Sequence, residues 1–249
     1  MKSVSLKLGV AAVALAGIAA SSAAFADEDN SLGTFSASVA VASDYRFRGI
    51  SQNNKEATPE FGLNWAGNHG FYGGAWTAKT NWGGNDPSYE ADFFVGKHTD
   101  LDGTDLNIEA YYYSYPDANY ATTASFYETI VQLSHAFGPL TLTATGANSP
   151  EWSFKGGVGW YGGATAAYTL TDWLTISGNV GHQWVDKAPN DYTHADIGLT
   201  AVWKSFSLDL RYLGTDIKKE DCTSFWMATK NACSGGFTAT VTYNIAKLF

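Results

Sequence analysis

Segments in which apolar and polar side chains alternate recur along the chain from residue 34 to the carboxyl terminus. Alternation with a period of two is typical of β-strands, because successive side chains of a strand point to opposite faces. Most segments have roughly the ten residues that a tilted strand needs to cross a bilayer. The sequence predicts twelve strands: 34–46, 58–66, 70–80, 89–98, 104–115, 125–136, 139–147, 156–169, 173–183, 193–203, 205–214 and 237–249.

The connections between these segments alternate in length. The short ones are 66–70, 99–104, 137–140, 170–173 and 203–206, and the long polar ones are 47–57, 81–88, 116–124, 148–155, 184–192 and 215–236. Outer-membrane barrels have this asymmetry, with short periplasmic turns and longer extracellular loops. We therefore predict an all-β fold, a transmembrane antiparallel up-and-down β-barrel of about twelve strands. It would form a single domain over residues 27–249.

The first 26 residues have the layout of a secretory signal peptide. Lys2 and Lys7 precede an apolar core at 8–20, and the triplet Ala-Phe-Ala at 24–26 precedes Asp27. The core is shorter than the ~20 residues that a membrane-spanning helix needs. We expect cleavage after Ala26 and export to the outer membrane of a Gram-negative bacterium.

The last predicted strand ends in an aromatic residue, Phe249. Such an ending resembles the assembly signal of bacterial outer-membrane barrels, which makes the barrel-assembly machinery an expected partner. An ordinary final strand of a β-protein is the alternative.

The two faces of the predicted strands differ in polarity, and we expect the polar face to point inward and the apolar face to contact outer-membrane lipid. A soluble lipocalin-like barrel would have the opposite arrangement. Aromatic residues near strand ends are expected at the two membrane interfaces: Trp65, Trp76, Trp173, Trp203 and Tyr212. The charged residues on the polar face are Asp44, Arg46, Arg48, Glu60, Lys79, Glu90, Asp92, Asp105, Glu109, Glu128, Asp196, Asp209 and Arg211.

The balance of charge limits the partners. The formal net charge is −9 for the whole chain, and removal of Lys2 and Lys7 with the leader makes it more negative. Nucleic acid is not an expected partner, because its binding needs a basic surface. The chain has two cysteines, Cys222 and Cys233, both in the connection 215–236. In an exported chain they most simply form one local disulfide, and we expect no metal site and no cofactor.

Three stretches resemble a known family: "VASDYRFRGISQ" from Val41, "PEFGLNW" from Pro59 and "FYGGAW" from Phe71. They are similar to the Gcw_chp family of proteobacterial proteins, also called the TorF family of proposed porins. The resemblance runs over essentially the whole chain after the leader. It implies an outer-membrane β-barrel, and it implies no catalytic residues.

A channel for small hydrophilic solutes or ions is the expected function. The polar face carries nine acids and four bases, and fixed charges in a lumen set ion preference, so we expect a weak preference for cations. Arg46 and Arg48 would offer a local site for an anionic solute. Alternatively, these charges pair with one another and fill a narrow barrel.

A hydrolase and a surface-interaction barrel are the two alternative functions. A hydrolase would need an acid–base group, and the nearest approach is His182 with His194 and Asp196 on neighbouring strands. His182 lies on the apolar parity and the other two on the polar one, so no catalytic residues are predicted. A surface-interaction barrel would use the connection 215–236, where Phe225 and Trp226 are candidate contacts. The same connection could instead fold over the pore mouth.

The stretch "SDYRFRGISQ" at 43–52 reads as the outer end of the first strand. In this interpretation Tyr45 and Phe47 face lipid, whereas Asp44, Arg46 and Arg48 face the lumen. Acids such as Asp44 and Glu60 are the expected partners of the two arginines.

Overall fold

A computed structural model describes residues 33–83, 86–187, 191–225, 229–246 and 248. The predicted signal peptide, the aromatic terminus Phe249 and the candidate contact Trp226 lie outside the described residues. The wall of the molecule consists of twelve strands that close into one barrel. They are β1 (Thr34–Ala42), β4 (Thr58–Ala66), β5 (Phe71–Lys79), β6 (Tyr89–Leu101), β7 (Thr104–Ser114), β8 (Phe126–Phe137), β9 (Leu140–Ser149), β10 (Gly159–Thr171), β11 (Leu174–Val185), β12 (Tyr192–Trp203), β13 (Phe206–Thr215) and β14 (Gly236–Ile245).

Closure comes from the first strand, which pairs antiparallel with β4 on one side and with the last strand, β14, on the other. Val39 of β1, for example, is opposite Phe61 of β4 and Tyr243 of β14. All other neighbours in the barrel are consecutive along the chain. Closure leaves no unpaired sheet edge, which is the condition for β-structure in a lipid core. The predicted up-and-down barrel is therefore confirmed.

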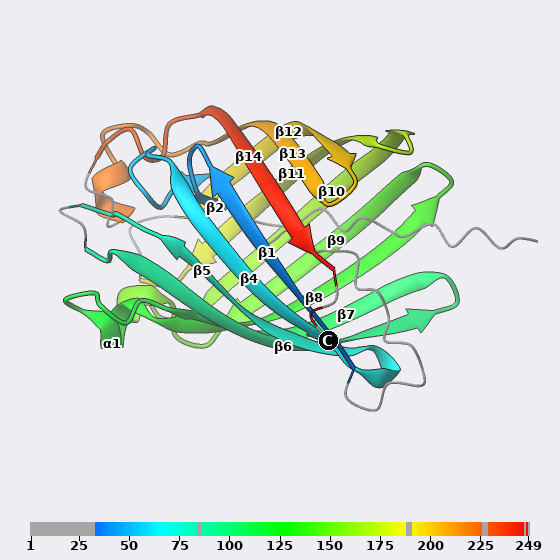
Figure 1. Cartoon of the computed structure of the whole chain (residues 1–249). Helices are drawn as coiled ribbons and strands as arrows, with labels where there is room; N and C mark the ends of the chain where they lie inside the picture. Colours follow the sequence, from blue (N-terminus) through cyan, green and yellow to red (C-terminus); the bar gives the residue numbers. More distant parts are fainter. Residues whose placement is uncertain (1–32, 84–85, 188–190, 226–228, 247, 249) are drawn as a thin grey trace, which may run out of the picture.

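The connections follow the predicted alternation. Figure 1 shows the long ones gathered at one end of the barrel, with the final strand β14 running toward the other. The long connections contain α1 (Ala121–Ala124), η2 (Ser153–Lys155) and η3 (Cys222–Phe225), and one short turn contains η1 (Asn68–Gly70). Among the described residues, no helix has the length and apolar character needed to cross a membrane.

The outer surface is apolar. Large apolar side chains of the barrel strands are exposed on it, among them Phe61, Phe93, Val95, Ile197, Leu210 and Val241. The predicted interfacial residues Trp173, Trp203 and Tyr212 are exposed as well, whereas Trp65 is half-buried. The alternate positions are small or polar and largely enclosed, so the apolar parity faces out and the polar parity faces in.

Strand β5 differs from the prediction. Trp76 is buried, at 6% exposure, and packs inside the barrel. Lys79 is on the opposite parity, where its exposed ammonium group lies 3.5 Å from a carboxylate oxygen of Glu56. The predictions of an interfacial Trp76 and a lumenal Lys79 were thus both wrong. Aromatic residues occupy both parities of this strand, Phe71 on one and Tyr72 on the other, so its sequence does not indicate which face points inward.

Candidate functional site

The stretch 43–52 is not the end of the first strand. β1 ends at Ala42, and the chain turns into a short hairpin in which β2 (Arg46–Phe47) pairs with β3 (Ile50–Ser51). The two turn residues, Arg48 and Gly49, have φ angles of 44° and 88°. Positive φ at both central positions is typical of a type I′ turn, which suits a two-residue hairpin loop. We call residues 44–52 the inner hairpin.

The inner hairpin lies inside the barrel, because it contacts strands on opposite sides of the wall. Tyr45 packs edge-on against Trp76 of β5, with ring centroids 5.0 Å apart. Phe47 packs in the same way against Tyr113 of β7, at 5.3 Å. Arg48 reaches β8, β10 and β11. The prediction that Tyr45 and Phe47 face lipid was therefore wrong, since Tyr45 is only 3% exposed and Phe47 packs on inward-facing rings.

Arg48 makes several polar and aromatic contacts with the barrel wall. Its Nη1 and Nη2 atoms donate to Oε1 and Oε2 of Glu128, at 2.9 and 2.7 Å, and Nη1 also donates to the side-chain oxygen of Gln183. The guanidinium carbon lies 4.1 Å from the ring centroid of Tyr161 and 5.7 Å from that of Trp152. We call Glu128, Gln183, Tyr161 and Trp152 the arginine cage.

The cage stabilises the positive charge of the Arg48 guanidinium group. Burial alone would lower the pKa of the guanidinium, but the Glu128 carboxylate keeps that pKa above its ordinary value. Glu60, which was expected to pair with the arginines, is not the partner of Arg48. Planar, bidentate pairing is the arrangement that distinguishes arginine from lysine.

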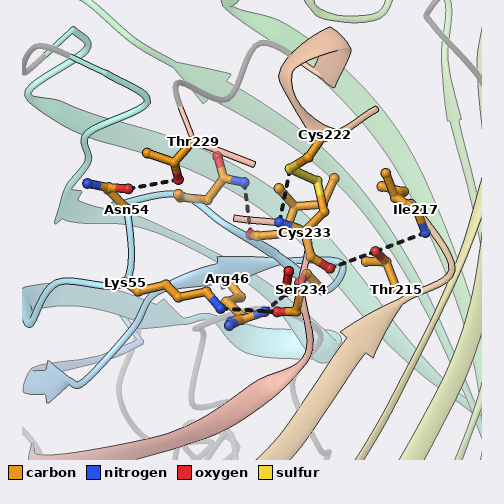
Figure 2. Close-up of a disulfide and its surroundings, with 12 residues drawn as sticks. Arg46, Asn54, Lys55, Thr215, Ile217, Cys222, Thr229, Cys233 and Ser234 are labelled. Atoms are coloured by element: carbon orange, nitrogen blue, oxygen red, sulfur yellow. Dashed lines mark hydrogen bonds between the residues drawn. A yellow bond between two sulfur atoms is a disulfide. The ribbon is translucent and has the colours of Figure 1, made fainter. Parts of the chain in front are cut away.

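Arg46 joins the inner hairpin to the last long connection. Its Nε donates to Asp44 at 2.6 Å, as predicted, and its Nη1 donates to the backbone oxygen of Ser234 at 2.9 Å. The backbone N–H of Ser51 donates to Ala232. Figure 2 shows Arg46 and Lys55 converging on Ser234, next to the disulfide between Cys222 and Cys233.

That disulfide was predicted and is confirmed. Both cysteines are fully buried in a small core with Ile50 and Tyr192. The two cysteines therefore pack on Ile50 of the inner hairpin. Partial burial, and then the charge of Arg46, lower the pKa of the neighbouring Lys55.

Beside the inner hairpin, three acids that were predicted on the polar face are enclosed together: Glu60, Glu90 and Asp92. The hydroxyl of Tyr115 donates to Glu90 at 3.0 Å, and that of Tyr111 donates to Asp92 at 2.9 Å. The second carboxylate oxygen of Glu90 has no hydrogen-bond partner among the described residues. Among all the residues that the structure describes, no group of three or more histidine, cysteine or acidic residues is arranged to hold a metal ion.

The remaining predicted residues lie further along the lumen. Glu109 accepts a hydrogen bond from Tyr72 at 2.8 Å. Arg211 pairs with both Asp196 and Asp209. The side chains of Arg211 and Asp209 are 13% and 28% exposed, compared with 4% and 0% for Arg48 and Glu128. The lumen is thus more enclosed at the arginine cage than around Arg211.

The side chains of the two candidate acid–base histidines, His182 and His194, do not contact each other. His182 is opposite Thr193 across the β11–β12 pair and contacts its hydroxyl at 2.8 Å. His194 is opposite Gly181 and contacts the hydroxyl of Tyr161 at 3.1 Å. Since His182 directly follows Gly181, the two imidazoles lie on opposite faces of the wall.

Sequence reasoning missed several residues of the cage. Gln183, Tyr161 and Trp152 carry no motif, and they come from separate strands and a loop. The one local signal was Arg48-Gly49, because a residue pair that includes glycine between two apolar residues suits a tight hairpin.

The comparisons with known proteins agree with this architecture. A family model described as "Bacterial protein of unknown function (Gcw_chp)" matches residues 26–249. The chain belongs to the Gcw_chp family. A search of curated proteins found no match for this Gcw_chp sequence.

Solved structures with a similar fold are outer-membrane proteins. The KdgM porin, solved in complex with disordered oligogalacturonate, superposes with a TM-score of 0.58 at 9% identity, over 84% of this chain and 98% of that one. The NanC porin does so with a TM-score of 0.57 at 9% identity, over 86% and 100%. An outer-membrane channel from Pseudomonas putida F1 has a TM-score of 0.50 at 9% identity, over 88% and 99%. At these identities the likeness is one of fold: this Gcw_chp protein has the barrel fold of porins.

Proposed function

We propose that this Gcw_chp protein is an outer-membrane channel for the diffusion of small hydrophilic solutes or ions. The observation that carries the proposal is the polarity of the closed barrel, which has apolar side chains on its outside and acids, amides and hydroxyls on its inside. A lining of this kind is what a water-filled path through a membrane requires. Similarity in fold to porins supports the same reading.

We propose further that the inner hairpin forms the constriction of this channel. Arg48 and Glu128 are almost completely buried, whereas Arg211 and Asp209 are partly accessible. Twelve-stranded barrels lie between small barrels filled by side chains and the larger porins with open pores. A lumen of intermediate width needs only one inserted element to become narrow.

The lumenal charges favour cations. Glu90 and Glu109 have no basic partner among the residues that the structure describes, and their carboxylates accept hydrogen bonds from tyrosine hydroxyls. Both arginines of the inner hairpin are paired with acids, so they present little net positive charge to a solute. An acidic oligosaccharide such as the oligogalacturonate of the KdgM porin complex would be repelled, because fixed negative charges in a lumen disfavour the entry of anions.

The burial of the inner hairpin favours one alternative, a barrel whose lumen stays closed and whose outer loops bind a partner. Planar-bilayer recording separates the two functions. A channel is expected to produce discrete conductance steps with the refolded wild-type protein. A closed barrel would produce none.

We propose no enzymatic role. The best acid–base pair in the sequence is split across the wall, since His182 and His194 lie on opposite faces. Incubation of the refolded protein with phospholipid and with peptide tests this directly, and release of fatty acid or cleaved peptide would contradict it.

A further inference from the structure

The walls of the arginine cage belong to the barrel, not to the inner hairpin. Glu128 is in β8, Tyr161 in β10 and Gln183 in β11, while Trp152 precedes η2. Arg48 is the group that the inner hairpin inserts between them. If the inner hairpin moved, the carboxylate, the amide oxygen and the aromatic faces would stay behind as an open pocket.

The chemistry of these walls matches one cation closely. A guanidinium group is flat, carries its donors in a fixed fork, and stacks on aromatic rings. The cage offers a two-oxygen acceptor at 2.9 and 2.7 Å, an additional amide acceptor, and ring centroids at 4.1 and 5.7 Å from the guanidinium carbon. A compact ammonium or alkali ion can also lie over an aromatic face, but it has no planar fork of donors to match the two carboxylate oxygens.

The inner hairpin that delivers Arg48 is small and held in an uncommon conformation. Each of its strands has two residues, and a two-stranded hairpin is at best marginally stable by itself. Arg48 has a φ of 44°, a region that a non-glycine residue occupies when its surroundings enforce it. The two-residue hairpin turn requires this conformation, and the contacts of the Arg48 side chain in the cage hold the turn in place.

We propose that the arginine cage is a recognition site for the guanidinium group of a permeating solute, and that Arg48 occupies this site in the narrowed channel. The inference deepens the proposed channel function, on which it rests, by naming the class of solute. A guanidinium-bearing solute competes with Arg48 for Glu128, and displacement of Arg48 releases the inner hairpin from the constriction. The narrowed state is thereby stabilised by Arg48, which carries the same guanidinium group as the solute.

The test uses the full-length protein refolded in detergent micelles, with methylguanidinium chloride as the probe and calorimetric titration as the readout. Arg48→Gly vacates the cage and also suits the positive φ at this position. We expect this variant to bind methylguanidinium at least tenfold more tightly than the wild type, in which Arg48 must leave first. It should also bind methylammonium at least tenfold more weakly than methylguanidinium.

The matched control is the double variant Arg48→Gly, Glu128→Gln, which keeps the size of the carboxylate but not its charge. Loss of a charge-assisted bidentate pair weakens binding by about an order of magnitude or more, so we expect at least a tenfold loss of affinity. Equal affinities in the two variants, or in Arg48→Gly and wild type, would show that the probe binds elsewhere and would overturn the proposal.

Two further results keep the test decisive. If Arg48→Gly does not refold, a variant with residues 44–52 replaced by a Gly-Ser linker vacates the same cage while all barrel strands are retained. No binding of methylguanidinium to that variant would also overturn the proposal. Because titration in micelles needs no ion flux, binding without conductance would reject the channel and retain the site, whereas conductance without binding would do the reverse.

Discussion

Arg48 and Glu128 are 80 positions apart in sequence and form a bidentate ion pair inside the barrel, with N···O distances of 2.9 and 2.7 Å. Their side chains are 4% and 0% exposed. The pair connects the inner hairpin to β8 and so joins the constriction to the barrel wall. The stability and the conductance of the protein are both expected to depend on it.

Replacement of Arg48 by alanine leaves the Glu128 carboxylate buried without its partner. Breaking a buried pair in this way typically costs about 3–5 kcal/mol, and we expect a drop of that order in the free energy of unfolding, measured by urea titration in detergent. The control is Lys79→Ala, which removes an exposed pair with Glu56. Because exposed pairs contribute only about 0–1 kcal/mol, equal losses in the two variants would contradict the role of Arg48.

Gly49→Ala tests whether the inner hairpin fits closely against the barrel wall. A β-carbon at this position would lie 2.7 Å from a methyl carbon of Thr215 and 3.0 Å from Cβ of His194. Gly103 is a matched control, because its φ of 87° is nearly the same as the 88° of Gly49 and its β-carbon would meet nothing within 4 Å. Gly103→Ala should therefore cost only the backbone strain of about 1–2 kcal/mol.

Gly49→Ala should cost more than Gly103→Ala and should raise single-channel conductance, since the inner hairpin can no longer dock. Urea unfolding and planar-bilayer recording of both variants measure these two effects. The idea of a docked hairpin fails if the two variants lose equal stability and both conduct as the wild type does.

The disulfide is expected to stabilise the contact between the last long connection and the inner hairpin. Cys222 and Cys233 are 11 positions apart, and closure of a loop of this size contributes about 2–3 kcal/mol by chain-entropy reasoning. Reduction should weaken the contacts from Arg46 to Ser234 and from Ser51 to Ala232, and should increase current fluctuations in bilayers.

A reducing agent should also shift the wild-type band on a gel, and Cys222→Ser should show no such shift. An identical shift in that variant would mean that the band change does not come from this disulfide.

Ion preference tests the sign of the lumenal charge. In a KCl gradient we expect a reversal potential of the cation-selective sign. Glu109→Gln, in the lumen beside Tyr72, should reduce this potential, whereas Glu56→Gln, at an exposed position, should leave it unchanged. A clear preference for anions in the wild type would contradict the acidic lumen.

Much of the barrel could be predicted from the sequence because a barrel wall is built from local information. Each strand faces two different environments, so the period of two and the lengths of the connections identify the strands directly. The bounds of β4 were predicted without error, and most other strand ends differ by one to three residues. The predicted parity of β5 was reversed, because this strand has aromatic residues on both faces and so lacks a contrast between an apolar and a polar face.

The inner hairpin could not be predicted in the same way. Residues 43–47 continue the alternation of β1, and a strand inside the barrel has the same period as one in its wall. An inserted hairpin differs from a wall strand in the residues that it contacts. For Arg48 these are Glu128 and Gln183, which are 80 and 135 positions away in the sequence. Pairing over such separations is set by the closed barrel as a whole and leaves no local trace.

The account depends most on a polar lumen narrowed by the inner hairpin. Planar-bilayer recording compares the refolded wild type with the variant in which residues 44–52 are replaced by a Gly-Ser linker. We predict discrete conductance steps for the wild type and steps at least twofold larger for the variant. An absence of steps from both proteins, in any salt, would contradict the account.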